Sequence, residues 1–377
     1  MLSSCTRFAF LSCTCSFQYD GTEALQTNIS LGDLWLQGMA IGAAAHNLTV
    51  QYCMPYPNQV LAAAGMSHVV TNIRATGDYW PNSTQWQIGP TSLLYWALGI
   101  LPFKDGFYSS TNVQIGGYPE GPELRPDLQA LIATLSCAMV GPMDGINLIN
   151  ATRIMTTCRS DGTILKPDQP IRTSDWCFYK DPNVGNKLST SATTKVHDPA
   201  HCFIYVTHSD IPGLGRVRYL FSNETDTALT PSMAQIGRND NNDDDDFTSN
   251  SNTQYAIYNW YTRDLQLLQE ENIFKPGYEG HRYSVIIPVL KGGWIFLGEV
   301  DKYVPTSRLR INNVAALDDS KLEVVATGVQ DEEVKFCVAK ASNLAHIHCE
   351  TITFESTLPQ MIIFDDLSPS TESSVAM

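Results

Sequence analysis

The pattern of apolar and polar residues divides the chain into two parts. In residues 17–178, apolar runs of strand length alternate with segments of helical periodicity, and several of those runs end at a polar residue. After residue 178, short β-rich runs are separated by turn residues, with almost no helical segment between them. The first pattern is typical of β/α units, and the second predicts an antiparallel β-sandwich.

In the first part we expect about five strands and five helices. Ser30, with Asp33 three residues later, resembles a capping box that opens the first helix, and Leu34, Ile41 and Ala45 would share one face of it. The predicted helices span residues 30–45, 59–64, 91–98, 126–134 and 146–157. The predicted strands span residues 17–20, 48–54, 69–74, 99–103 and 137–140.

Polar residues stand at the end of each predicted strand, namely Asp20, Gln51, Arg74 with Asp78, Asp105, and Asp144. Functional groups at the carboxyl ends of parallel strands are typical of the mouth of a (β/α)8 barrel. A closed barrel of this kind needs eight strands, and only about five are present. The fold class expected is therefore α/β plus all-β: a partial (β/α)8 TIM barrel followed by an antiparallel β-sandwich domain.

The predicted organisation has four parts. Residues 1–16 form an atypical N-terminal segment, residues 17–180 the catalytic-like partial barrel, and residues 195–365 the C-terminal β-sandwich. Residues 237–252 contain an acidic run that could be a calcium loop but lacks the central glycine and closing glutamate of an EF-hand, so a disordered insertion is the preferred interpretation. Residues 366–377 are expected to be a disordered tail.

Charge and hydropathy exclude several classes of partner. The net charge of −15 argues against nucleic acid, because its phosphates require a basic surface. No run of about 18 apolar residues exists, so no membrane span is expected. Sequons at Asn28, Asn47, Asn82, Asn150 and Asn223 weakly favour a secretory or extracellular location. The compartment and the oligomeric state stay open.

Metal, nucleotide and serine-hydrolase chemistry are not indicated. The ten cysteines fit no metal-ligand spacing, and several lie in apolar runs where a cysteine behaves as a small core residue. His346 and His348 would share one face of a strand, as a zinc site requires, but strand alternation alone explains their spacing. No G-x-S-x-G, G-x-G-x-x-G or Walker motif is present. We therefore expect no metal and no cofactor.

Asp78 and Asp20 suggest a glycosidase. Asp78 precedes Tyr79 and Trp80, and an acid beside two large rings would be partly desolvated and able to donate a proton. Paired with an ionised Asp20 it would supply the two carboxylates of glycoside hydrolysis. The alternatives are that Asp78 caps the following helix and that Asp20, which precedes Gly21, is a turn residue.

The chain also resembles a known family over these residues, the raffinose synthase, seed imbibition and alkaline α-galactosidase group of glycoside hydrolases (family 36-like, in the α-galactosidase clan). Residues 74–80 resemble its Arg-x-x-Asp-Asp-aromatic segment, with Gly77 in place of the first aspartate. Residues 101–107 resemble a Pro-Asp-Trp-Asp-Met-Phe segment, residues 136–144 a small-residue strand with Gly-Pro, and residues 165–178 a Leu-Pro-Asp-Gly stretch.

The resemblance implies retaining hydrolysis, or transfer, of α-glycosides, with Asp20 as nucleophile and Asp78 as acid/base. The residues expected to bind the carbohydrate substrate are Gln51, Arg74, Trp80 and Asp105.

The chain departs from the family in two ways. Gln18 replaces a lysine of the family, and the matched region begins at about the fourth barrel strand, which implies an N-terminal truncation. The alternative is a catalytically impaired carbohydrate-binding relative, or a fragment of a longer glycosidase.

Overall fold

The computed structural model describes residues 8–9, 28–53, 55–114, 121–178, 203–223, 253–269 and 280–365. These residues form a mixed α/β structure with one parallel sheet, three antiparallel sheets and few helices. Features predicted from the sequence that lie outside the described residues include the first strand at 17–20 with Gln18 and Asp20, the acidic run at 237–252 and the tail at 366–377. In the described part, no helix is long and apolar enough to cross a membrane.

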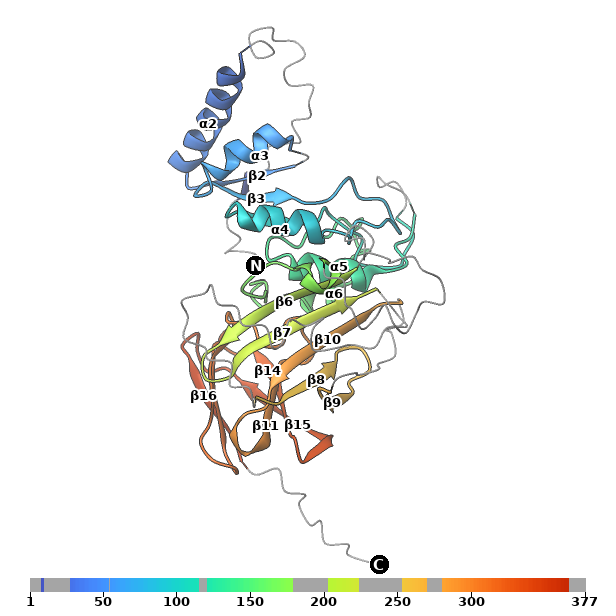
Figure 1. Ribbon diagram of the computed structural model, residues 1–377, viewed down its shortest axis with the longest axis vertical. Helices are drawn as coiled ribbons and strands as arrows, with labels where there is room; N and C mark the ends of the chain where they lie inside the picture. Colours follow the sequence, from blue (N-terminus) through green and yellow to red (C-terminus); the bar gives the residue numbers. More distant parts are fainter. Residues whose placement is uncertain are drawn as a thin grey trace, which may run out of the picture.

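The N-terminal half is built on a four-stranded parallel sheet with the order β1-β2-β3-β4. Figure 1 shows α2 and α3 beside β2 and β3, at the end of the molecule away from the antiparallel sheets. The partial TIM barrel is not confirmed. The strands are β1 (Phe8–Ala9), β2 (Thr49–Tyr52), β3 (Val70–Arg74) and β4 (Leu101–Phe103), and the intervening helices are α2 (Ile29–Ala45), α3 (Pro57–Ala64) and α4 (Gly89–Ala97).

Helix α2 begins one residue before Ser30. Its N-cap is Asn28, whose side-chain oxygen accepts a hydrogen bond from the Ser30 amide at 3.0 Å. The predicted capping box at Ser30 and Asp33 is therefore wrong, because asparagine has the same short acceptor and occurs two residues earlier.

The buried face of α2 also differs from the prediction. The apolar face predicted to hold Leu34, Ile41 and Ala45 is not the buried one, because Leu34 and Ile41 are 59% and 70% exposed. The side chains that pack into the core are Leu36, Ala40 and Ala43. The helix is apolar on most sides, so periodicity alone does not select the face that meets the sheet.

The fifth predicted strand does not form. Cys137 has a φ of 67°, and residues 137–140 form no strand; a single parallel bridge joins Phe107 to Pro142 instead. The helix before it, α5 (Pro126–Leu135), agrees with its prediction. The helix after it, α6 (Ala151–Met155), is much shorter than the predicted 146–157, because Asn150 caps it late.

The C-terminal half consists of antiparallel sheets, as predicted. A six-stranded sheet has the order β5-β6-β7-β10-β8-β9, and two three-stranded sheets have the orders β11-β14-β15 and β12-β13-β16. The strands are β5 (Arg172–Thr173), β6 (Ile204–Ile211), β7 (Gly215–Ser222), β8 (Tyr255–Asn259), β9 (Leu265–Leu267), β10 (Arg282–Pro288), β11 (Trp294–Gly298), β12 (Ile311–Ala316), β13 (Leu322–Ala326), β14 (Glu333–Lys340), β15 (Asn343–Thr353) and β16 (Gln360–Phe364).

The two halves share one hydrophobic core. Strand β5, from the chain before residue 178, pairs antiparallel with β6 after it. The Trp86 ring, which is 1% exposed, contacts Phe203, Tyr205 and Phe221 at centroid distances of 5.1–6.5 Å. Packing between the parallel-sheet half and the antiparallel half is therefore continuous rather than a thin interdomain contact.

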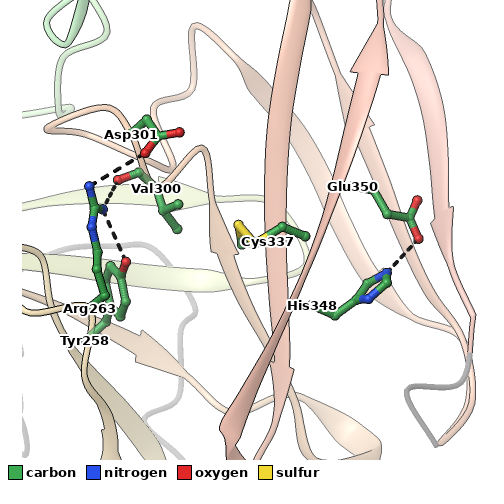
Figure 2. The surroundings of a disulfide bond; sticks show 8 residues. Tyr258, Arg263, Val300, Asp301, Cys337, His348 and Glu350 are labelled. Carbon is green, nitrogen blue, oxygen red and sulfur yellow. Dashed lines mark hydrogen bonds and ion pairs between the residues drawn. A yellow bond between two sulfur atoms is a disulfide. The ribbon is translucent and has the colours of Figure 1, made fainter. Parts of the chain in front are cut away.

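A disulfide joins Cys337 on β14 to Cys349 on β15, two residues directly opposite each other in the ladder. Figure 2 shows its surroundings, where His348 pairs with Glu350 at 3.0 Å. No pairing of these two cysteines was predicted from the sequence. The strand register brings them together, and that register is not readable from their spacing in the chain.

Candidate functional site

The site is built around Arg74, the last residue of β3, whose side chain is 4% exposed. Its Nη2 donates to Asp78 Oδ1 at 2.8 Å, and its Nη1 lies 3.1 Å from Asp105 Oδ2. Asp78 follows β3 and Asp105 follows β4, so the carboxyl ends of two adjacent parallel strands contribute to one cluster. One guanidinium thus holds two carboxylates, which fixes both side chains.

Backbone contacts hold the two loops together. The Tyr79 amide donates to Asp105 Oδ2 at 2.9 Å, and the Asp105 amide donates to Thr76 Oγ1 at 3.1 Å. The Gln85 side-chain amide also donates to the Gly77 carbonyl at 2.5 Å. The loop after β3 is therefore ordered against the loop after β4, and Asp105 acts as the link between them.

The charges of the cluster are mutually stabilised. Burial opposes the charge on Arg74, but Asp105, then Cys53 and Asp78, outweigh that effect and raise the pKa of the guanidinium above its ordinary value. Arg74 is therefore a fixed cation at the edge of the sheet. A fixed cation between two carboxylates leaves their outer oxygens to accept hydrogen bonds from a ligand hydroxyl.

Lys104 lies beside the cluster and is 1% exposed. Burial, only partly offset by Asp105 and Glu123, lowers its pKa to about 7. Its ammonium donates to the Asp105 carbonyl at 3.0 Å and lies 5.2 Å from the centre of the Tyr79 ring. This lysine is therefore a titratable group at physiological pH within the supporting shell of the site.

A buried acid outside the cluster, Glu123, anchors the aromatic part of the loop. Glu123 is 0% exposed and accepts hydrogen bonds from the Tyr79 hydroxyl at 2.8 Å and the Asn82 amide at 3.0 Å. The Asn82 side chain in turn donates to the Pro122 carbonyl and accepts from the Leu124 amide. Burial, and then the charge of Glu123, raises the pKa of the Tyr79 hydroxyl, so this tyrosine is a neutral donor.

The two rings after Asp78 have different environments. Tyr79 is 3% exposed, whereas Trp80 is 50% exposed. The side chain of Asp78 is 62% exposed and paired with Arg74, so the prediction that two rings would desolvate it is wrong. The reason is that consecutive residues of an extended loop point in different directions, so adjacency in the chain does not enclose the acid.

Gln51 lies on β2 opposite Asn72 of β3, two residues before Arg74. Its side chain is buried, and its Oε1 has no hydrogen-bond partner among the described residues. By strand register it shares a face of the parallel sheet with Asn72 and Arg74. It is thus a neighbour of the cluster on the next strand rather than a member of it.

One further candidate does not join the cluster. Asp144 accepts hydrogen bonds from the Ser109 amide at 3.0 and 2.9 Å, and so orders a loop instead of ending a strand. Asp20 lies outside the described residues. Within the ranges described, no group of three or more histidine, cysteine, aspartate or glutamate side chains is arranged to hold a metal ion.

Sequence reasoning anticipated Arg74, Asp78 and Asp105 because it placed them at neighbouring strand ends. It did not anticipate Glu123, since this glutamate follows no strand and reaches Tyr79 only through the fold. Lys104 was seen at the end of its strand, but its burial and lowered pKa depend on packing against Tyr79 and Phe107.

Comparisons with known proteins give little further information. No family model and no curated protein matches the chain, so membership of the raffinose synthase and α-galactosidase group is not supported. Solved structures similar to the chain include an isomalto-dextranase of Arthrobacter globiformis T6 complexed with panose, with 10% sequence identity and a TM-score of 0.33. That match covers 89% of this chain but only 62% of the enzyme's chain, and a TM-score this low does not indicate a shared fold.

Proposed function

We propose that the protein is carbohydrate-active and resembles a glycoside hydrolase, with its sugar site at the carboxyl ends of β3 and β4. The observation that supports this most directly is the pairing of Arg74 with both Asp78 and Asp105, next to the half-exposed ring of Trp80. Carboxylates that accept hydroxyl hydrogen bonds, beside an apolar ring face, are the groups that bind a pyranose.

The proposed mechanism is retaining hydrolysis of an α-glycoside. Asp20 attacks the anomeric carbon as the glycosidic C–O bond breaks, and Asp78 gives its proton to the leaving oxygen. In the second step Asp78 takes a proton from water, whose oxygen attacks the anomeric carbon and releases the Asp20 carboxylate. Arg74 and Asp105 position Asp78, and Trp80 and Gln51 contact the sugar.

The second candidate is a carbohydrate-binding protein without turnover. One observation favours it: Asp78 is exposed and bound to Arg74 instead of being enclosed in an apolar pocket. In this case the same cluster binds sugar hydroxyls, and no acid catalysis follows. Binding and hydrolysis therefore have to be measured separately.

The first experiment measures hydrolysis of a panel of aryl α-glycosides, and binding of the corresponding free sugars, by the full chain. If the catalytic proposal is correct, Asp78→Asn and Asp20→Asn each lower kcat/KM by about a thousandfold or more while sugar binding is kept. Asp331→Asn is the control, because Asp331 is exposed in the antiparallel half and its φ of 63° suits asparagine.

Trp80→Ala tests the shared part of both candidates. Loss of the ring should weaken sugar binding by about tenfold, as expected for one aromatic contact. Trp35 is also partly exposed but lies on α2, and Trp35→Ala should leave sugar binding unchanged. Binding without turnover supports the second candidate, and the absence of both in the wild type rejects a carbohydrate site here.

A further inference from the structure

A hollow lined by basic residues lies on the outer face of the six-stranded sheet. One face of this sheet packs on the main core, and the opposite face carries a small separate apolar cluster formed by Cys177, Ile204, Val206, Leu220, Ile257 and Ile286. Beyond the edge of that cluster the face becomes basic. Neither the proposed sugar site nor the fold accounts for this change.

Strand register gathers the basic residues. Arg172 of β5 lies opposite Val206, His208 of β6 lies opposite Arg218 of β7, and Arg216 is two residues before Arg218 on the same strand. Because directly opposed residues share a face, and residues two apart on a strand do also, all four basic side chains lie on the outer face.

These side chains line a small hollow that is partly open to solvent. The described residues that line it include Arg172, His208, Arg216 and Arg218, and no carboxylate is among them. The remaining lining is neutral and contains Gln169 and Thr207. A concave surface lined by three guanidinium groups and a histidine attracts negative charge.

One nearby acid, Asp210, is already engaged. Its carboxylate accepts from Arg216 Nε at 2.8 Å and Nη2 at 3.1 Å, and it lies 3.5 Å from His208 Nε2. This bidentate pair fixes the direction of Arg216 at the rim of the hollow. Asp168 adds a second carboxylate at this edge, where it accepts from the Asp210 amide at 2.8 Å and lies 3.9 Å from Arg308. Among the described residues, the arginines and His208 that line the hollow still outnumber these two carboxylates.

Arg218 has a buried hydrogen-bond donor that no described residue satisfies. Its Nη1 is buried and has no hydrogen-bond partner among the described residues, and its guanidinium lies 5.7 Å from the centre of the Tyr255 ring. Burial lowers its pKa below the ordinary arginine value, which reflects the cost of keeping this charge away from water. A buried donor of this kind is stabilised when an anion accepts from it.

We propose that this hollow binds a small oxyanion group, a phosphate or a sulfate, held by Arg172, Arg216 and Arg218. The guanidinium fork matches the oxygen spacing of such groups, and several arginines around one hollow favour a dianion over a single carboxylate. The group arrives either as the free ion or as the ester of a small molecule such as a sugar. The inference is independent of the proposed glycosidase activity.

Isothermal titration calorimetry of the full chain with inorganic phosphate and with inorganic sulfate tests the proposal. The ionic strength is held constant by adjusting the chloride concentration. A glucose phosphate and a galactose sulfate form the second arm, with glucose and galactose as uncharged references. Saturable binding of the inorganic ions indicates a free-ion site. Binding at least about tenfold tighter for an ester than for the ion indicates that the ester is the ligand.

Arg172→Gln and Arg216→Gln should each weaken binding by about ten- to a hundredfold, since each removes a charged hydrogen-bond donor. Arg218→Met should abolish anion binding. If this variant fails to fold, the results for Arg172→Gln and Arg216→Gln decide the outcome. Arg263→Gln, in an ion pair with Asp301 away from the hollow, is the control for net charge (Figure 2). No saturable binding to any anion, or equal weakening in the control, overturns the proposal.

Discussion

Lys104 lies in an environment that disfavours its charge. It is buried beside the Arg74 cluster, and its Nζ lies against the rings of Tyr79 and Phe107. Away from water, the protonated form is less favourable than it is in solution. Its pKa of about 7 lies well below the ordinary 10.5. Between these two values the unfolded chain holds a proton at this site that the folded chain has released, so the free energy of unfolding rises with pH.

We therefore expect Lys104→Met to flatten that rise. Between pH 7 and pH 9, Lys104 should raise the free energy of unfolding of the wild type by about 2 kcal/mol. This increase should be missing in Lys104→Met when urea unfolding is measured at both pH values. Lys335→Met, at an exposed position on β14, should keep the wild-type dependence. Equal slopes in wild type and Lys104→Met would show that the lysine is charged when folded.

At the scale of elements, α4 packs closely against the six-stranded sheet. Gly89 opens this helix, and a Cβ at that position would overlap Thr173 Oγ1 and the Tyr205 ring. The Ser92 hydroxyl, one turn later, donates to the Ile171 carbonyl at 2.5 Å. The helix therefore approaches β5 and β6 so closely that only glycine fits at its first residue.

Gly89→Ala should lower the free energy of unfolding by about 1–3 kcal/mol, the usual cost of overpacking. Gly38→Ala is the matched control, since Gly38 lies within α2 and its Cβ would meet nothing within 4 Å. That control should gain up to about 1 kcal/mol from helix propensity. Denaturant unfolding of both variants measures the contrast, and equal effects would contradict the close approach.

The Cys337–Cys349 bridge is a second feature of this scale, because it ties β14 to β15 across a loop with a sequence separation of 12. Closing a loop of that length is worth about 3 kcal/mol. The double variant Cys337→Ser, Cys349→Ser should lose roughly that amount, measured by urea unfolding without reductant. Cys158→Ser, at a cysteine with no disulfide, should change little; a loss as large as that of the double variant would argue against the bridge.

Elements bounded by turn residues were predictable, and their faces and partners were not. The apolar runs at residues 217–221, 283–290 and 321–327 predict strands whose ends lie within two residues of those of β7, β10 and β13, because an apolar run ends where turn residues begin. The buried face of α2 and the absent strand at residues 137–140 depend on packing partners far along the chain. A Cys137 with positive φ also has no signature in its residue type.

For the whole molecule, sequence reasoning recognised two kinds of structure but not their common core. The change from β/α alternation to antiparallel strands near residue 178 is real, yet β5 crosses it to pair with β6. The Arg74 cluster could be predicted from the sequence, because the ends of parallel strands meet at one edge of the sheet. The basic hollow was not, since it arises only from the register of β5, β6 and β7.

Asn82 has a consequence for producing the protein. The carboxamide nitrogen to which an oligosaccharide would be attached already donates to Pro122, and the backbone there has a φ of 61°. A glycan on that nitrogen would compete with its hydrogen bond to Pro122, beside the Asn82 amide that Glu123 accepts from. In a host that glycosylates secreted proteins, replacing Thr84 by alanine removes the acceptor sequence without touching the asparagine, and so preserves this part of the fold.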